Sequence, residues 1–135
     1  MTSPDRRLVN LAAVVLVLAA VSAIYFQATA GITLDPDTLF DVQIKRIHEY
    51  KRQLLNAIQC VVWYNRLRAN PNLDVPPRTV LFAGKAAPAY HLAKVIIRLV
   101  TGIAKVVNAD PAVRDKLRVE FLPNYSCTLA EHLIP

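Results

Sequence analysis

The chain opens with a long apolar segment. From Leu8 to Phe26 no residue is charged, and about 18 consecutive apolar residues are enough for a helix to cross a bilayer. This pattern predicts an N-terminal hydrophobic helix that inserts into a membrane as an anchor. Arg6 and Arg7 before the segment, and the small residues from Ala28 to Ala30 after it, keep a cleaved signal peptide as an alternative. A buried Ala/Val-rich helix of a larger protein would show the same pattern.

The pattern changes after the turn-forming cluster Asp35-Pro36-Asp37. Apolar and polar residues then alternate, which predicts a strand ending at Ile44. From Ile47 to about Arg68 the apolar residues recur at helical spacing, and Asn70-Pro71 ends the helix. The apolar positions of the strand are Phe40, Val42 and Ile44, and those of the helix are Ile47, Tyr50, Leu54, Ile58, Val61 and Val62.

The same order of strand and helix then repeats. The sequence predicts a second strand over residues 79–82, a second helix over residues 88–108 and a third strand over residues 117–121. Thr128-Leu129-Ala130-Glu131 has the form of a capping box and predicts the start of a third helix. The predicted apolar face of the second helix contains Leu92, Val95, Ile96, Leu99, Ile103 and Val107.

Three strand-helix units in succession predict the α/β class. Right-handed crossovers would make the strands parallel, so we expect a partial Rossmann-like domain with a doubly wound parallel sheet of about three βα units, preceded by the N-terminal hydrophobic helix. The predicted organisation is a hydrophobic segment over residues 1–30, a linker over residues 31–38 and the partial domain over residues 39–135. A chain of 135 residues has room for one such core.

Composition adds a preference for anions. The net charge is +6 and the isoelectric point is near 9.6, with 54% hydrophobic residues and a mean hydropathy of +0.30. This charge favours nucleic acid, an acidic lipid surface or a small phosphate-bearing ligand. The cysteines, Cys60 and Cys127, have no C-x-x-C spacing, so we expect buried free thiols, with a disulfide as the alternative. They form no cluster with His48, His91 or His132 that resembles a metal site.

The candidate chemistry lies where the first predicted strand ends. Ligands of doubly wound sheets collect beyond the carboxyl ends of the strands, and here Lys45 and Arg46 are followed by Lys51. Arg can hold a phosphate with two parallel hydrogen bonds, Lys adds a point charge, and amides of a first helical turn favour an anion. A solvated basic face is the alternative. We expect no nucleic acid here, because the junction lacks a broad stripe of interleaved aromatic and basic residues.

At this junction the string KRIHEYKRQLLN resembles the glycogen, starch and maltodextrin phosphorylases. The resemblance runs from about Ile32 to Pro135 and includes VLFAGKAAPAYHLAK, DKLRVEFLPNY and LAEHLIP. It implies part of the C-terminal domain of a glycosyltransferase that has two Rossmann-like domains. Enzymes of this family cleave α-1,4-glucan with inorganic phosphate to release glucose 1-phosphate, use pyridoxal 5'-phosphate as cofactor, form homodimers and are cytoplasmic.

The resemblance also implies roles for single residues. Lys45 would lie near the cofactor phosphate, and Arg46 and Lys51 would bind the substrate phosphate. Tyr125 would contact the cofactor, and Tyr90 would line a regulatory inhibitor site. No residue of this sequence is expected to bind a metal.

Some family features differ or are missing. Ala83, Ala89 and Arg114 stand where the family usually has glycines, and Ser126 stands where Arg is common. The cofactor-bearing lysine motif E-A-S-G-T-G-N-M-K does not occur in these residues, so we expect the chain to be inactive by itself. A membrane-anchored, non-catalytic anion-binding or interaction module is the alternative function. Cytoplasmic location follows from the resemblance, whereas the apolar segment indicates a membrane or export.

Overall fold

The computed structural model describes residues 11, 13–15, 17, 21, 27, 31–32 and 34–134. They form two compact units: Asp37–Cys127, and the described residues before Asp37 together with those after Cys127. The predicted membrane segment from Leu8 to Phe26 lies largely outside the described residues, so it stays a prediction. None of the helices in the described part of the chain has the length and apolar character needed to cross a membrane.

A parallel three-stranded sheet forms the centre of the unit Asp37–Cys127. Its strands are β1 (Leu39–Ile44), β2 (Arg78–Ala83) and β3 (Leu117–Leu122), in the spatial order β1-β2-β3. Val42 on β1 aligns with Leu81 on β2, which aligns with Glu120 on β3. The predicted α/β class with a parallel sheet is therefore confirmed.

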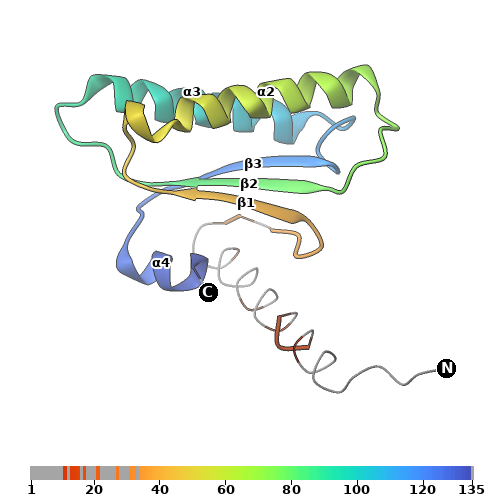
Figure 1. The fold of residues 1–135 in the computed structure, drawn as a ribbon, viewed down its shortest axis with the longest axis horizontal. Coiled ribbons are helices and arrows are strands. Elements are labelled where there is room, and N and C mark those ends of the chain that lie inside the picture. Colours follow the sequence, from red (N-terminus) through yellow and green to blue (C-terminus); the bar gives the residue numbers. More distant parts are fainter. Residues whose placement is uncertain are drawn as a thin grey trace. The chain divides into compact units, whose positions relative to one another are not determined.

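Two long helices, α2 (Gln53–Ala69) and α3 (His91–Ala109), lie on the same side of the sheet (Figure 1). This follows from the strand order, because successive crossovers of one hand between adjacent strands place their helices on one face. A short 3₁₀ helix, η1 (Glu49–Lys51), precedes α2, and α4 (Cys127–Leu133) follows β3. Since α4 begins at Cys127, its N-cap position is residue 126 and Thr128 lies inside the helix, so the predicted capping box is misplaced by two residues.

The predicted first helix begins later than its apolar spacing indicates. Ile47 is buried, but its backbone continues the sheet, because its amide donates to the carbonyl of Lys85 at 3.1 Å. Arg52, with φ of 61°, separates η1 from α2. Tyr50, which was expected on the apolar face, is 71% exposed. Sheet pairing of the segment 44–47 thus overrides its helical periodicity.

The buried face of α2 also differs from the predicted one. The helix is apolar around most of its circumference, so periodicity alone cannot identify the face that contacts the sheet. Small residues decide it, because Ala57 and Cys60 allow the helix backbone to approach the strands closely. The residues of α2 that are buried are Gln53, Ala57, Cys60 and Leu67, whereas the predicted Leu54, Ile58, Val61 and Val62 are exposed.

The same shift occurs in α3. Ile96 and Val107 are buried as predicted, but Leu92, Val95 and Leu99 are exposed. Ala93, Val100 and Ala104 take the remaining buried positions, again because small side chains suit close packing on a sheet. Both helices therefore have small residues among those that face the sheet, and both carry several large apolar residues on their outer surfaces.

The polar face of strand β1 points toward the helices, and its apolar face points away from them. The side chain of Gln43 lies on the helical side of the sheet, because its amide donates to the carbonyl of Lys51 at 3.0 Å and its oxygen accepts from Asn56 of α2 at 3.1 Å. Neighbouring residues of a strand point to opposite faces, so the apolar Phe40 and Val42 lie on the face away from α2 and α3. Both are exposed.

The thiol of Cys60 provides a test of this packing. Burial, together with the nearby carboxylate of Asp41, raises the pKa of Cys60 from 9.0 to about 11, so at pH 8 only about 0.1% is thiolate. We expect iodoacetamide to alkylate the exposed Cys127 rapidly and Cys60 only after unfolding in urea, as followed by intact-protein mass spectrometry. Equal alkylation rates of Cys60 and Cys127 in the native protein would contradict the buried position of Cys60.

The raised pKa of Cys60 also makes the stability of the fold depend on pH. Because this pKa is raised in the folded protein, the neutral thiol stabilises the fold below about pH 9, and this contribution disappears as the pH rises through 11.

Gly84 provides a second test, at the end of β2. Its φ is +154°, and a Cβ built on it would collide with the carbonyl oxygen of Lys45. We expect Gly84→Ala to lower the free energy of unfolding by more than about 2 kcal/mol, measured by urea denaturation. Gly102→Ala is the matched control, because a Cβ there meets nothing within 4 Å and Ala suits a helix better by about 0.5–1 kcal/mol. Equal urea midpoints for the two variants would refute the steric argument.

Candidate anion-binding site

The backbone that carries the two leading cations is fixed by the sheet. Beyond the end of β1, the amide of Lys45 donates to the carbonyl of Ala83 at 3.1 Å, and the amide of Ile47 donates to Lys85 at 3.1 Å. The side chain of Ile47 is buried in the core. Backbone hydrogen bonds at Lys45 and Ile47 therefore fix the chain on both sides of Arg46. The side chains of Lys45 and Arg46 are exposed.

A buried amide braces the turn that follows. Gln53, the first residue of α2, is fully buried. Its side-chain nitrogen donates to the carbonyl of Arg46 at 3.3 Å, and its oxygen accepts from the amide of His48 at 3.3 Å. The Gln53 side chain thus satisfies the backbone carbonyl before Ile47 and the backbone amide after it, and its own buried polar atoms find the partners that they need. Sequence reasoning missed Gln53, because the predicted apolar face of the helix ran through Leu54 and left Gln53 at a polar position.

Lys51 is positioned by neighbours on β1 and η1. Its carbonyl accepts from Gln43, its side chain is half-buried, and its ammonium nitrogen lies 5.5 Å from the ring centroid of Tyr50. Its amide is already used, because it donates to the carbonyl of His48 at 3.0 Å. The expectation of free first-turn amides beside Lys45 and Arg46 is therefore corrected: the first turn of α2 starts at Gln53.

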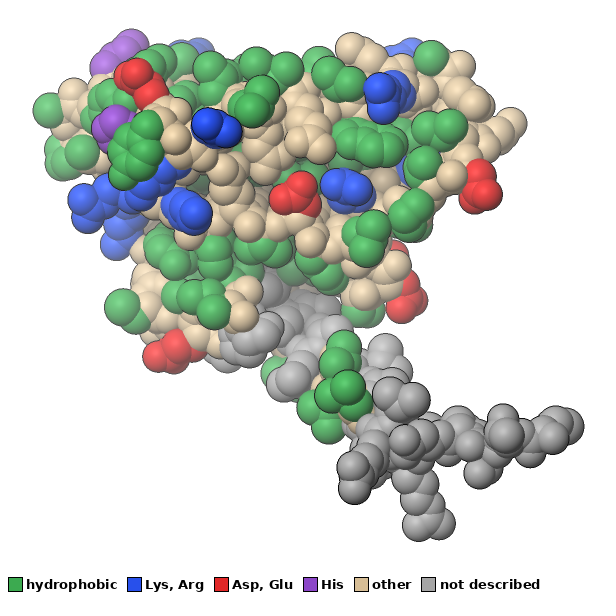
Figure 2. All heavy atoms as spheres, in the orientation of Figure 1, with side chains coloured by type: hydrophobic (Ala, Val, Ile, Leu, Met, Phe, Trp, Pro, Cys, Tyr) green, Lys and Arg blue, Asp and Glu red, His purple; other side chains and the backbone are tan. Residues whose placement is uncertain are grey.

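The charges at this junction are not neutralised from within. In the part of the chain that the structure describes, no carboxylate forms an ion pair with Lys45, Arg46 or Lys51. The nearest acidic side chain along the sequence, Glu49, accepts a hydrogen bond from the hydroxyl of Tyr90 at 2.6 Å. Figure 2 shows Lys and Arg side chains gathered at the left, where β1 and β2 end in Figure 1. Uncompensated cations on a fixed backbone suit an anionic ligand.

Aromatic rings border the basic junction. The ring of His48 lies 4.6 Å from that of Tyr50 and 4.8 Å from that of Tyr90, centroid to centroid. Tyr90 also accepts a hydrogen bond at 3.4 Å from the amide of Glu49. Partial desolvation and then the bond to Glu49 raise the pKa of the Tyr90 hydroxyl, which therefore stays a donor at neutral pH. The structure thus brings Tyr90 next to the β1–α2 turn, a contact that spacing in the sequence could not reveal.

Tyr125 reaches the same edge of the sheet from another strand. It follows β3 directly after Asn124, which has φ of 55°. Because β2 lies between β1 and β3, the strand ends that precede Lys45 and Tyr125 are about 10 Å apart. The structure therefore places the predicted cofactor residues on opposite sides of β2, at the edge where parallel sheets bind ligands.

The substitutions at family glycines are compatible with the backbone. Among the described residues, the non-glycine positions with positive φ are Arg52 and Asn124. Ala83, Ala89 and Arg114 are therefore in conformations that any residue adopts. The glycine that the turn does require, Gly84, is present and was not singled out from the sequence.

The comparisons with known proteins agree with one another. The family model described as carbohydrate phosphorylase matches residues 18–135. Human muscle glycogen phosphorylase is 57% identical over 113 residues, which cover 84% of this chain and 13% of that protein. The rabbit muscle form is 56% identical over the same shares of the two chains. Glycogen phosphorylase of Chlamydia pneumoniae is 58% identical over 105 residues, or 78% of this chain and 13% of that protein.

These matches include the junction from Lys45 to Lys51, and they agree with the resemblance seen in the sequence. The chain spans about 13% of the length of the curated relatives that it matches. The family model covers well over half of the chain. The chain belongs to the carbohydrate phosphorylase family.

Proposed function

We propose that this chain is the phosphate-binding part of an α-1,4-glucan phosphorylase, a glycosyltransferase that transfers glucose from a glucan end to inorganic phosphate. The observation that supports this most directly is the set of cations Lys45, Arg46 and Lys51, which form no ion pair with a carboxylate of the described residues and stand on a backbone braced by Gln53. Family membership supplies the reaction class. Glucan, phosphate, homodimer formation and a cytoplasmic location are proposed with it, as properties of the longer proteins that the chain resembles.

The cations have complementary tasks in this proposal. Arg46 holds the substrate phosphate with parallel hydrogen bonds, and Lys51 adds charge from a half-buried position. Lys45 holds the phosphate of the cofactor. Two unit negative charges 4 Å apart repel by about 4 kcal/mol near a protein surface, so two phosphates come together only if cations offset that repulsion.

Pyridoxal 5'-phosphate fits part of this site. Lys45 offers an exposed ammonium group and Tyr125 an aromatic ring and a hydroxyl, and both follow strand ends on the ligand-binding edge. When bound, this cofactor would supply a phosphate group that exchanges a proton with the substrate phosphate. Ser126 carries no charge where the family often has Arg, so we expect Ser126 to bind an anion more weakly than an Arg at this position would. Tyr90 is proposed to line a regulatory site, since Glu49 and His48 hold its ring in place.

A non-catalytic anion-binding module is the second candidate. The same cations favour it, because no carboxylate of the described residues pairs with them. The two candidates share phosphate binding and differ in turnover. Purified chain incubated with glucan, phosphate and pyridoxal 5'-phosphate should therefore bind the anions and release no glucose 1-phosphate. Turnover that Lys45→Ala abolishes would contradict our expectation that these residues alone are inactive.

Binding of inorganic phosphate to the chain tests the site directly. We expect a ³¹P NMR titration to give a dissociation constant in the millimolar range, and Arg46→Ala to weaken it about tenfold, because one bidentate contact is lost. The control is Lys105→Ala, which removes an exposed lysine from α3. Added salt should weaken phosphate binding to the unchanged chain and to the Lys105→Ala variant. Equal losses in the two variants would indicate a nonspecific basic surface.

A chimera tests the proposed roles in an active enzyme. The aligned part of human muscle glycogen phosphorylase would be replaced by the matching residues of this chain, which are 57% identical to it. We expect the chimera to release glucose 1-phosphate, and Arg46→Ala within it to lower kcat by about 100-fold, the scale of losing a charge-stabilising group. Lys105→Ala in the chimera should leave kcat unchanged. A chimera that folds and keeps its activity after Arg46→Ala would refute the assignment.

A further inference from the structure

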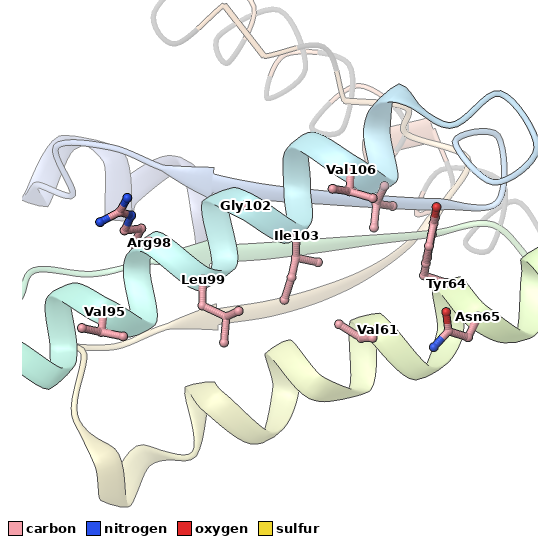
Figure 3. A pocket seen from close by; sticks show the side chains of 10 residues that line it. Val61, Tyr64, Asn65, Val95, Arg98, Leu99, Gly102, Ile103 and Val106 are labelled. Carbon is pink, nitrogen blue, oxygen red and sulfur yellow. The ribbon is translucent and has the colours of Figure 1, made fainter.

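A groove of about 560 Å³ runs along the outer surface between α2 and α3. In Figure 3, Leu99 and Ile103 extend from α3 toward α2, and Val61 lies opposite them. Gly102 has no side chain at this point, and a Cβ built there would meet nothing within 4 Å, so the groove is open along its α3 wall. Asn65 and Arg98 are the polar side chains that line it besides the Tyr64 hydroxyl, and the large apolar side chains that line it include Val61, Val95, Leu99, Ile103 and Val106.

The apolar surface continues beyond the groove. Residues three or four positions apart share one face of a helix, so Leu54 and Ile58 extend the line of Val61 along α2, and Leu92 extends the line of Val95 along α3. These side chains are between 38% and 49% exposed, and Val106 at the other end is 56% exposed. A continuous apolar surface of this kind marks an interaction site, whereas scattered exposed side chains do not.

The charged side chains of α2 and α3 have one sign. Neither α2 nor α3 contains an Asp or Glu residue. Lys94, Arg98 and Lys105 recur along α3, and Arg98 is one of the residues that line the groove (Figure 3). On α2, Arg68 is paired with Asp110 at 3.3 Å. The groove is therefore apolar at its floor and basic along its α3 side.

This combination selects the occupant. A second copy of the same face would bring like charges together, which disfavours a symmetric dimer. A lipid surface suits protruding apolar side chains, whereas this surface is hollow between two helices. An amphipathic helix fits a hydrophobic groove between helices with its apolar side chains, and an acidic flank would complement the basic α3 side. We propose that the α2–α3 groove binds an amphipathic α-helix with an acidic polar face.

A designed peptide tests this proposal on the full chain. The probe is a fluorescein-labelled helix of about 18 residues, comparable in length to α3, with Leu at every third or fourth position and Glu on the polar face. We expect micromolar binding by fluorescence anisotropy, weaker at high salt because the α3 side is charged. The matched probe with Lys in place of Glu should bind at least about tenfold more weakly.

Substitutions in the groove identify the surface that binds. Leu99→Gln should weaken binding of the acidic probe about tenfold or more, since it places a polar side chain among the lining residues. Arg98→Glu should weaken the acidic probe and improve the Lys probe. Leu55→Gln is the control, because Leu55 is 60% exposed on α2 but does not line the groove. Circular dichroism and urea midpoints would establish that each variant is folded.

Three results would overturn the proposal. The first is equal binding of the Glu and Lys probes, and the second is equal losses for Leu99→Gln and Leu55→Gln. The third is a preference for another occupant: binding of phosphatidylserine vesicles that depends on Leu99 while the peptide does not bind, or a dimer in analytical ultracentrifugation that Leu99→Gln dissociates. The groove is distinct from the phosphate site, so Arg46→Ala should leave peptide binding unchanged.

Discussion

The close approach of the chain at Gly84 to the carbonyl of Lys45 determines how the ligand-binding edge is built. Because Gly84 has no Cβ, the backbone after β2 can lie against the backbone after β1. The pairing of these strands then continues to Lys45 and Ile47, beyond the last residues of β1 and β2. This extension keeps Ile47 in the core and leaves the neighbouring Arg46 at the surface.

The brace formed by Gln53 depends on that extension. A helix that began at Ile47 would have made the segment 47–52 part of α2 and exposed its amides at the strand end. Instead, the turn is closed by η1 and by Arg52 at positive φ, and Gln53 connects the start of α2 to the carbonyl of Arg46. The cations thus belong to a rigid turn with a buried polar contact. Such preorganisation lowers the entropy lost when a small anion is bound.

Much of the fold could be predicted from period and order alone. The three strands lie within one or two residues of their expected positions, because period-two segments bounded by turns are a strong local signal. The buried faces of α2 and α3 could not be predicted in this way. Large apolar residues surround most of α2, and the sheet selected the face with Ala57 and Cys60, since close packing depends on shape as well as hydrophobicity. The large residues displaced from the core form the α2–α3 groove.

The α/β class, the parallel order of the elements and the family follow from the amino-acid sequence alone, because strand and helix periods and a long specific string are local properties of the chain. The sequence also identified Lys45, Arg46 and Lys51 as the basic junction. Three features became visible only in three dimensions: the brace that Gln53 forms at this junction, the contact of Tyr90 with Glu49 from 41 residues away, and the helical faces that stay exposed. These features depend on contacts between distant segments and on the fit of small side chains against a sheet, and neither leaves a periodic signal in the sequence.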